Sequence, residues 1–241
     1  MSVAKIPIVL IVCYAFKRCI SPPNPPAPKT ERINTNFLER DWYIGIFGPD
    51  GAPGHQNVQL VFGVLEAATI MARNYPSSAC SQIVLNTLVP QRGRPEQLHL
   101  SISGAIGSLL ILTGMVLRLT TYRYLGKFFK YEASIQKDHK LITSGPYALV
   151  RHPSYAALII SHLGWVLWNC GDGSWFRELR WCDTLVGKCV FLTYFFGVLC
   201  GELYLVLARM KNEDEALRKC FKDQWEEWAR TVPYSVVPGV Y

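Results

Sequence analysis

The chain has 241 residues, of which 50% are hydrophobic and only 18% are charged, a composition that is unusually apolar for a soluble domain. Its net charge of +7 does not indicate nucleic-acid binding, because the basic residues flank apolar blocks and form no Lys/Arg-rich run with interleaved aromatic residues. The composition therefore predicts an integral membrane protein that contacts the lipid bilayer and has no nucleic-acid partner.

Apolar residues gather in five blocks along the chain. These are Ile6 to Phe16, Val58 to Ala72, Leu100 to Leu117, Ala156 to Trp168, and Thr184 to Ala208. We expect each block to cross the membrane, which gives an all-α, polytopic transmembrane helical bundle of about five spans. The first block lacks a basic n-region and a small-residue cleavage site, so residues 1–20 are expected to be a retained span.

The segment between the first two blocks is rich in proline. SPPNPPAPKTER at residues 21–32 is expected to be non-helical and extended, because each proline lacks a backbone donor and restrains its predecessor. Residues 21–56 then form a connector, and residues 57–117 hold spans two and three. In the third block, the small pairs Ser103/Gly107 and Gly104/Ser108 predict a close approach to another helix.

The distribution of charge predicts the topology. Residues 118–152 and the tail from Arg209 carry many basic side chains, and both are expected to face the cytosol. The fourth and fifth blocks then form a hairpin with a luminal turn, GDGSWFRELRWCD, and the N-terminus is luminal. Cys170 and Cys182 fall on the oxidising side, where they either form a disulfide bridge or remain free thiols.

Several common catalytic patterns are missing from the sequence. The eight cysteines form no CxxC pair, the five histidines form no HExxH or HxxxH pair, and no GxSxG elbow exists. The GDG at residues 171–173 lacks the third glycine and the preceding strand of a dinucleotide loop. We therefore expect no metal site, no serine hydrolase and no Rossmann fold.

Polar residues are dense in one run directly before the fourth block, QKDHKLITSGPYALVRHPSY. Taken singly, they have ordinary interpretations, such as Arg151 as an interfacial anchor and Pro153 in the first turn of a helix. A second polar pair, Arg209 and Glu213, is four residues apart and so lies on one helical face. Glu66 and Glu202 lie inside apolar blocks, a position that marks either function or an ion pair.

The two polar regions together resemble the isoprenylcysteine carboxyl methyltransferase family. The resemblance lies in HKLITSGPYALVRHPSY and RMKNEDEALRKCFKDQWEEWARTVPYSVVP, in their order and in their separation, and covers about half of the chain. It implies an enzyme of the endoplasmic reticulum membrane that uses S-adenosyl-L-methionine. It also implies the reaction, methyl esterification of the α-carboxylate of a C-terminal prenylated cysteine in CaaX-processed proteins.

The resemblance also implies site residues within a catalytic region at residues 118–241. The positions that match cofactor-contacting residues are Gln136, His139, Lys140, Leu141, Ile142, Tyr147, His152, Pro153, Ser154, Tyr155 and Glu213. Arg209 matches the catalytic residue that orients the substrate carboxylate. We expect Gly145, Pro146 and Pro153 to hold the loop before span four in a non-helical path, which forms a cytosolic cofactor pocket together with the C-terminal helix.

The chain departs from the family pattern at FKDQWEEW. Lys222 stands where the family often has glycine, and Trp225 and Trp228 replace aromatic hydroxyls, which puts the substrate range in doubt. Three alternatives stay open: a phospholipid N-methyltransferase, a sterol or enone reductase, and a catalytically silent membrane paralogue. The sequence does not determine the oligomeric state or the choice between farnesyl and geranylgeranyl chains.

Overall fold

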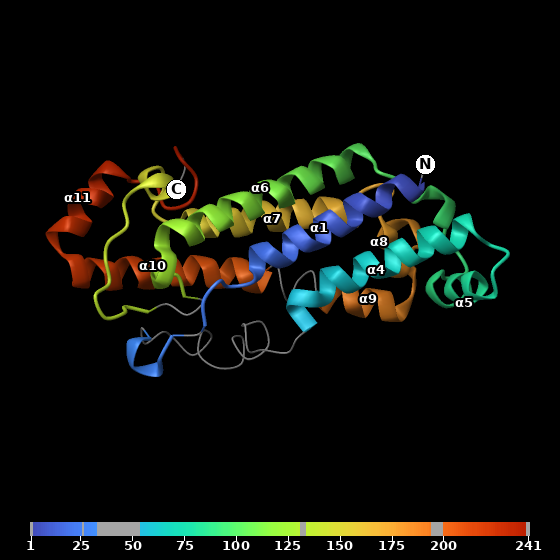
Figure 1. Ribbon diagram of the computed structural model, residues 1–241, viewed down its shortest axis with the longest axis horizontal. Coiled ribbons are helices and arrows are strands. Elements are labelled where there is room, and N and C mark those ends of the chain that lie inside the picture. Colours follow the sequence, from blue (N-terminus) through green and yellow to red (C-terminus); the bar gives the residue numbers. More distant parts are fainter. Residues whose placement is uncertain (1, 26, 33–53, 131–133, 194–199, 240–241) are drawn as a thin grey trace. The chain divides into compact units, whose positions relative to one another are not determined.

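The computed structural model in Figure 1 describes residues 2–25, 27–32, 54–130, 134–193 and 200–239. Within these ranges the chain is helical, and its β-type pairing is limited to an isolated antiparallel bridge between Arg32 and Ser134. The α-helices are α1 (Lys5–Ile20), α4 (Gly54–Asn74), α5 (Ala79–Leu88), α6 (Ile102–Leu125), α7 (Pro153–Cys170), α8 (Trp175–Glu178), α9 (Leu185–Leu192), α10 (Gly201–Phe221) and α11 (Asp223–Thr231). The predicted all-α fold is confirmed.

Short 3-10 helices lie between several of these elements. They are η1 (Ser2–Ala4), η2 (Lys29–Glu31), η3 (Pro95–Gln97), η4 (Gly126–Phe128), η5 (Gly145–Ala148) and η6 (Trp181–Asp183). Two of them correct the sequence predictions. The segment at residues 21–32 is not extended throughout, because η2 begins directly after Pro28. The loop before α7 is not wholly non-helical either, since Pro146 occupies the first turn of η5, where its missing N–H costs nothing.

The chain divides into two compact units. Unit 1 comprises Met1–Arg18, Gln56–Thr113 and Ile160–Gly201, and unit 2 comprises Cys19–His55, Gly114–Ile159 and Glu202–Tyr241. Helices α6 and α7 each contribute residues to both units. The polar run before the fourth apolar block belongs to unit 2 together with the charged C-terminal tail, so both predicted site regions lie within one unit.

Four apolar blocks correspond to the longer helices α1, α4, α6 and α7. The fifth block corresponds to α9 and the start of α10, and residues 194–199 between them lie outside the described part. Of the described helices, the segment Ile102–Phe128 is long and apolar enough to cross a membrane. The count of five spans and the topology stay predictions.

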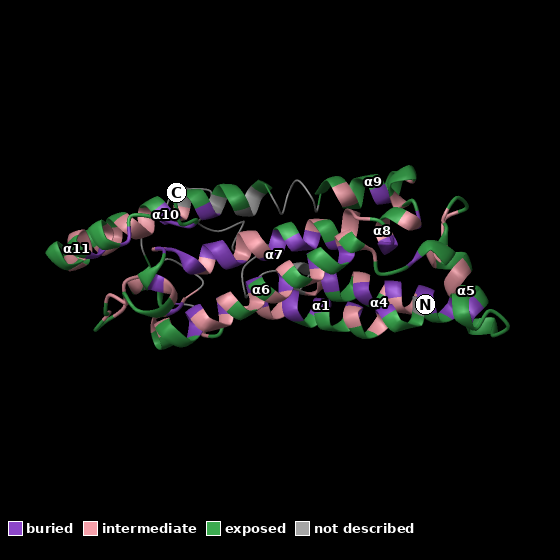
Figure 2. Cartoon of the chain, turned by 90° about the horizontal axis from the view of Figure 1, so that it is seen from above, coloured by how far each residue is buried: buried purple, intermediate pink, exposed green. Residues whose placement is uncertain are grey.

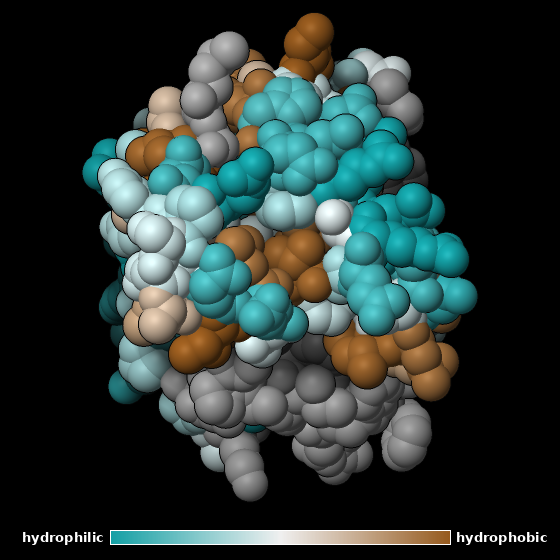
Figure 3. Space-filling view, turned by 90° about the vertical axis from the view of Figure 1, so that its right-hand side faces the viewer, coloured by the Kyte–Doolittle hydropathy of each residue, from teal (hydrophilic) through white to brown (hydrophobic). Residues whose placement is uncertain are grey.

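Many large apolar side chains on these helices are exposed, and exposed positions recur along the helices in Figure 2. Leu10 and Ile11 of α1 are half exposed, and so is Leu109 of α6. A membrane helix has this pattern, because lipid covers apolar faces that water would disfavour. Figure 3 views the side of the molecule that carries α5, where polar side chains cover much of the described surface, as suits a surface that meets water or headgroups.

In unit 1, α6 and α7 approach each other closely at a pair of glycines. A Cβ added to Gly107 would lie 2.7 Å from the carbonyl oxygen of Gly164, and one added to Gly171 would lie 2.3 Å from Ser103 Oγ. Only backbone hydrogens fit in this contact. The predicted close approach is confirmed for the pair Ser103 and Gly107, whereas a Cβ at Gly104 would meet only neighbours in its own segment.

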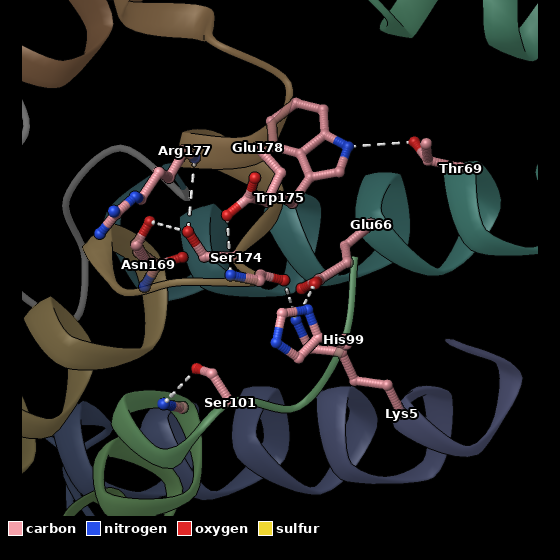
Figure 4. A network of polar contacts seen from close by, with 12 residues as sticks. Lys5, Glu66, Thr69, His99, Ser101, Asn169, Ser174, Trp175, Arg177 and Glu178 are labelled. Atoms are coloured by element: carbon pink, nitrogen blue, oxygen red, sulfur yellow. Dashed lines mark hydrogen bonds and ion pairs between the residues drawn. The ribbon is translucent and has the colours of Figure 1, made fainter. Parts of the chain in front are cut away.

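Unit 1 also contains a buried ion pair (Figure 4). The Lys5 ammonium donates to Glu66 Oε1 at 2.6 Å and to the carbonyl oxygen of Gly173 at 2.8 Å, and it lies 5.1 Å from the centre of the Trp168 ring. Beside it, the Trp175 indole donates to Thr69 Oγ1 at 3.0 Å. The expectation that Glu66 marks a function or an ion pair is thereby resolved in favour of the ion pair. The side chain of Glu202 lies outside the described residues.

None of the eight cysteines, including Cys170 and Cys182, forms a disulfide bond in the structure. Burial raises the pKa of the Cys182 thiol, and the carboxylate of Asp183 raises it further, so the thiolate needed for disulfide exchange is disfavoured there. The structure therefore agrees with the free-thiol alternative.

Unit 2 has two apolar clusters that flank the predicted site. One joins Tyr155 and Ala156 of α7 to Val206 and Met210 of α10 and to Val236 near the C-terminus. The other is described with the site below. In both cases an apolar contact ties α7 or the preceding loop to the C-terminal part of the chain. These contacts position the polar residues between them.

Candidate functional site

The start of α7 and the middle of α10 bring four predicted site residues together. The Tyr155 hydroxyl donates to Glu213 Oε1 at 2.6 Å, and Arg209 Nη2 lies 3.6 Å from the same oxygen. Glu213 Oε2 lies 3.7 Å from His152 Nδ1. The predicted common face of Arg209 and Glu213 is confirmed, since both project from α10 at a spacing of four residues. The result is a compact group of one carboxylate, one guanidinium, one imidazole and one phenol.

Asp214 extends this group and was not predicted from the sequence. Its Oδ1 lies 2.9 Å from His152 Nε2, and its Oδ2 accepts a hydrogen bond from Arg151 Nε at 3.3 Å. Asp214 therefore links two neighbouring residues of the RHPSY motif. The position of Asp214 directly after Glu213 is the only sequence signal that could have indicated it, and helical spacing alone does not separate a site residue from a solvated one.

The chain near the C-terminus closes over the start of α7 through backbone hydrogen bonds. The amide of Arg151 donates to the carbonyl of Tyr234 at 2.9 Å, and the amide of His152 donates to that of Ser235 at 2.7 Å. The Arg151 guanidinium donates to the carbonyls of Val232 and Pro233 and to Ser235 Oγ. Arg151 is thus a structural tie between the motif and the tail, in addition to any interfacial role.

Arg118 of α6 is buried on the other side of Ser154. Its guanidinium donates to the carbonyl and the hydroxyl of Ser154, to Tyr122 Oη at 2.9 Å and to the carbonyl of Cys19 at 3.2 Å. It also lies 5.2 Å from the centre of the Phe129 ring. Among the described residues no carboxylate pairs with it. A buried cation without a counter-ion is costly, so this position favours an anionic ligand group.

The loop before α7 forms the second part of the candidate site. Tyr147 packs with Trp228 and Val232 in a cluster that also includes Leu141 and Ile142. The Trp228 indole donates to the carbonyl of Tyr147 at 3.1 Å, so α11 is anchored to this loop. Burial raises the pKa of the Tyr147 phenol above its usual range, which keeps the hydroxyl protonated at neutral pH.

Gly145 gives this loop its path. Its φ is +62°, in the left-handed region that favours glycine, and an added Cβ would lie 2.3 Å from ring carbons of Tyr124. No other residue fits there without a shift of the Tyr124 ring. Tyr147, two residues later, is thereby placed in the turn η5 and directed into the cluster with Trp228.

Gln136, His139 and Lys140 lie nearer the start of the same loop. Gln136 Nε2 donates to the carbonyl of Phe128 at 2.9 Å, and the His139 ring lies 4.8 Å from the Phe128 ring. Burial lowers the pKa of His139, so its neutral form is favoured. Lys140 is exposed. The contacts of Gln136 and His139 tie them to the end of η4, and the role of all three residues as cofactor contacts stays a prediction.

The donor set suits a ligand that carries several kinds of polar group. Glu213 and His152 provide acceptors, Arg118 and Arg209 provide positive charge, and the cluster around Tyr147 provides an apolar and aromatic surface. S-adenosylmethionine carries an ammonium, a carboxylate, a sulfonium and an adenine. The residues therefore fit the cofactor implied by the resemblance.

A model of the phospholipid methyltransferase family matches residues 102–224 of the chain, which is about half of it. The matched range includes α6, the polar loop, α7 and α10, and so contains every predicted site residue. It does not include α1 or the proline-rich connector. The family signal therefore lies in the part of the chain that builds the site.

Curated proteins show the same relationship. The chain is 28% identical over 132 residues to protein-S-isoprenylcysteine O-methyltransferase B of Arabidopsis thaliana, which covers 54% of this chain and 57% of that protein. It is 27% identical over 143 residues to the human protein-S-isoprenylcysteine O-methyltransferase, which covers 58% of this chain and 43% of that protein. The chain thus spans about half the length of the curated relatives that it matches. The resemblance found in the sequence is confirmed.

A protein of a different named activity also matches. The chain is 31% identical over 102 residues to a Delta(14)-sterol reductase of Mus musculus, which covers 42% of this chain and 20% of that protein. Sequence similarity in this region is therefore shared by methyltransferases and a reductase. The choice between them depends on the chemistry of individual residues.

Proposed function

The chain belongs to the phospholipid methyltransferase family, and on that premise we propose that it is a membrane carboxyl methyltransferase. Its methyl donor would be S-adenosylmethionine, and its acceptor would be the α-carboxylate of a C-terminal prenylated cysteine in CaaX-processed proteins. The observation that carries the proposal is the group formed by His152, Tyr155, Arg209 and Glu213. The names of the Arabidopsis and human relatives support the choice of acceptor.

The acceptor chemistry requires little from the protein in terms of proton transfer. The α-carboxyl group at the end of a peptide ionises with a pKa of about 3.5, so it is already a carboxylate at neutral pH and needs no general base. Bound S-adenosylmethionine would supply an electrophilic methyl group on a sulfonium sulfur. The residues of the chain then have to orient the carboxylate and exclude water, and orientation alone can contribute about 7 to 11 kcal/mol to catalysis.

Arg209 is assigned the orientation of the substrate carboxylate. Its guanidinium is a planar fork of donors that matches a carboxylate, and its distance of 3.6 Å from Glu213 Oε1 is longer than a tight hydrogen bond. With its five N–H donors, the side chain can bind the substrate carboxylate while Tyr155 continues to donate to Glu213. A loose grip also preserves the nucleophilicity of the carboxylate.

Glu213, His152 and the cluster around Tyr147 are assigned to the cofactor. Glu213 provides the negative charge that a sulfonium or an ammonium prefers, and the apolar cluster of Leu141 and Ile142 offers a surface for adenine. Arg118, which has no carboxylate partner among the described residues, provides positive charge for a carboxylate. The remaining contacts of the cofactor, including those of Gln136, His139 and Lys140, belong to the proposal.

The finer assignments of location follow from the same proposal. We place the enzyme in the endoplasmic reticulum membrane with the N-terminus luminal and the C-terminus cytosolic. A prenyl chain dissolves in the bilayer and reaches the site from the membrane, whereas the cofactor arrives from the cytosol. A site at the boundary between apolar helices and charged loops accommodates both.

The direct test is to incubate detergent-solubilised protein with labelled S-adenosylmethionine and N-acetyl-farnesylcysteine. A base-labile methyl ester in the lipid fraction is the expected product. Label on a phospholipid amine instead would assign the alternative N-methyltransferase. Binding of NADPH in place of the methyl donor would assign a reductase, and binding of neither would assign a silent paralogue.

A further inference from the structure

Asp214 occupies a position that the proposed function does not yet use. It bonds to two residues of the RHPSY motif, His152 through Oδ1 at 2.9 Å and Arg151 through Oδ2 at 3.3 Å. Arg151 in turn holds Ser235 and the carbonyls of Val232 and Pro233. The carboxylate is therefore held by a fixed framework that includes the tail, and both of its oxygens are engaged by the motif.

This arrangement determines which nitrogen of His152 carries hydrogen. A carboxylate only accepts hydrogen bonds, so the Nε2 that lies 2.9 Å from Asp214 has to be the donor. In a neutral imidazole the other nitrogen, Nδ1, then has no hydrogen and acts as an acceptor. The ring is also held in place, because Nε2 is bonded to Asp214 and the ring is buried.

When the His152 ring is neutral, two acceptors face each other. Its Nδ1 and Glu213 Oε2 are 3.7 Å apart, and neither then has a hydrogen to donate to the other. The other oxygen of Glu213, Oε1, already accepts a hydrogen bond from the Tyr155 hydroxyl, so Tyr155 does not donate to Oε2. A ligand group with several N–H donors resolves this arrangement, and an ammonium has three.

We propose that Asp214 is a positioning residue that holds His152 as its Nε2-protonated tautomer, so that His152 Nδ1 and Glu213 Oε2 together bind the ammonium group of the cofactor. The inference rests on the proposed function, because it assigns a subsite within the proposed cofactor site. Asp214 itself does not touch the ligand. It acts through His152, as outer partners of functional histidines generally do.

The tautomer can be measured directly. Protein labelled with ¹⁵N-histidine in detergent micelles is examined by NMR, and the His152 signals are assigned with the variant His152→Gln. The wild type is expected to show a protonated Nε2 and a bare Nδ1. Asp214→Ala is expected to lose this preference, whereas Asp214→Asn, which keeps an acceptor oxygen, is expected to retain it. Glu215→Gln is the matched control, since Glu215 pairs with Lys219 on the exposed side of α10.

The ligand part of the inference needs a binding measurement without turnover. Calorimetry compares S-adenosylhomocysteine with its deaminated analogue, which lacks only the ammonium. We expect the wild type and Glu215→Gln to prefer the ammonium form by about tenfold or more, and Asp214→Ala to lose most of that preference while it still binds the analogue. A merely structural role of Asp214 would weaken both ligands equally.

Each of the following results would overturn the proposal. A bare Nε2 in the wild type, or hydrogen on both ring nitrogens, would exclude the tautomer, and an unchanged preference in Asp214→Ala would exclude the positioning role. Equal weakening of both ligands would reassign Asp214 to structure. If the wild type binds neither ligand while the NMR result holds, the cofactor assignment itself is wrong and the ammonium subsite falls with it.

Discussion

Each compact unit buries a group of charged side chains, and the two groups differ in whether their partners are complete. In unit 1 the Lys5 ammonium and the Glu66 carboxylate pair with each other, and a carbonyl and an indole ring complete the surroundings of the ammonium (Figure 4). In unit 2 Arg118 has no carboxylate among the described residues. When the His152 ring is neutral, its Nδ1 and Glu213 Oε2 are two acceptors that face each other there. A group whose charges are all paired indicates a structural role, and one whose partners are incomplete indicates a ligand. We call Lys5 and Glu66 the complete group, and Arg118, His152, Arg209 and Glu213 the open group.

The energetics support this distinction. A buried ion pair adds little net stability because desolvation offsets the attraction, but loss of one partner is strongly destabilising. The pair in unit 1 joins α1 to α4 across 61 residues of sequence, so it fixes how these helices pack. Arg118 is also held by hydrogen bonds, but without a carboxylate partner among the described residues its buried charge is retained at a cost to stability.

The largest expected effect comes from breaking the complete group. Glu66→Ala leaves the Lys5 ammonium buried without its counter-ion and is expected to destabilise the protein by about 3 to 5 kcal/mol. The measurement is thermal unfolding in detergent. The double variant Lys5→Met/Glu66→Leu removes both charges and is expected to recover most of the loss. Methyl transfer by the folded fraction should stay unchanged, and a specific loss of activity would place Glu66 in the function.

The next largest effect concerns the open group, where ligand binding and turnover should separate. Glu213→Ala is expected to weaken cofactor binding by about 100-fold, equivalent to about 2.7 kcal/mol, because it removes the carboxylate of the site. Arg209→Ala should spare cofactor binding and abolish turnover. Calorimetry with S-adenosylhomocysteine and the ester assay give the two readouts. Equal losses in both variants, with the fold intact, would contradict the assigned roles.

The parts of the fold that the sequence could predict are those that depend on local properties of the chain. The helical fold and the approximate positions of α1, α4, α6 and α7 followed from apolar blocks, because length and hydropathy are local properties. Helices α5 and α8 were missed. The first is 10 residues long and the second only four, with its start set by Ser174, whose Oγ accepts from the amide of Arg177.

Site residues were predictable where a motif or a helical spacing marked them. Glu213 and Arg209 were predicted together and lie together, and Tyr155 joins them from α7. Arg118 and Asp214 were missed because their importance comes from partners that are distant in sequence. Asp214 bonds to a residue 62 positions away, and local patterns do not record such a contact. Likewise, nothing local identified Lys5 as the partner of Glu66.

Arg118 offers a smaller test of the open group. Arg118→Met removes a buried charge that has no carboxylate partner among the described residues, but it also leaves the carbonyls of Cys19 and Ser154 without their donor, so stability should fall by about 1 to 3 kcal/mol. Cofactor or substrate affinity should fall by about tenfold, equivalent to about 1.4 kcal/mol, through loss of an anion contact. Thermal unfolding and calorimetry together check this. A large loss of stability with unchanged affinity would make Arg118 a structural residue like Lys5.

The smallest expected effect lies at the junction of α10 and α11, where a departure from the family pattern meets a strained backbone. Lys222 has a φ of +47° and precedes α11, while its carbonyl accepts hydrogen bonds from the amides of Trp225 and Glu226. Glycine adopts such a conformation without the steric cost of a Cβ. Lys222→Gly is therefore expected to stabilise the protein by about 1 kcal/mol, measured as a higher unfolding temperature. The control Lys219→Gly, within the regular helix α10, should destabilise by about the same amount.

Since α11 anchors the loop of Tyr147 through Trp228, the ester assay on Lys222→Gly also shows whether a more stable anchor alters turnover at the open group.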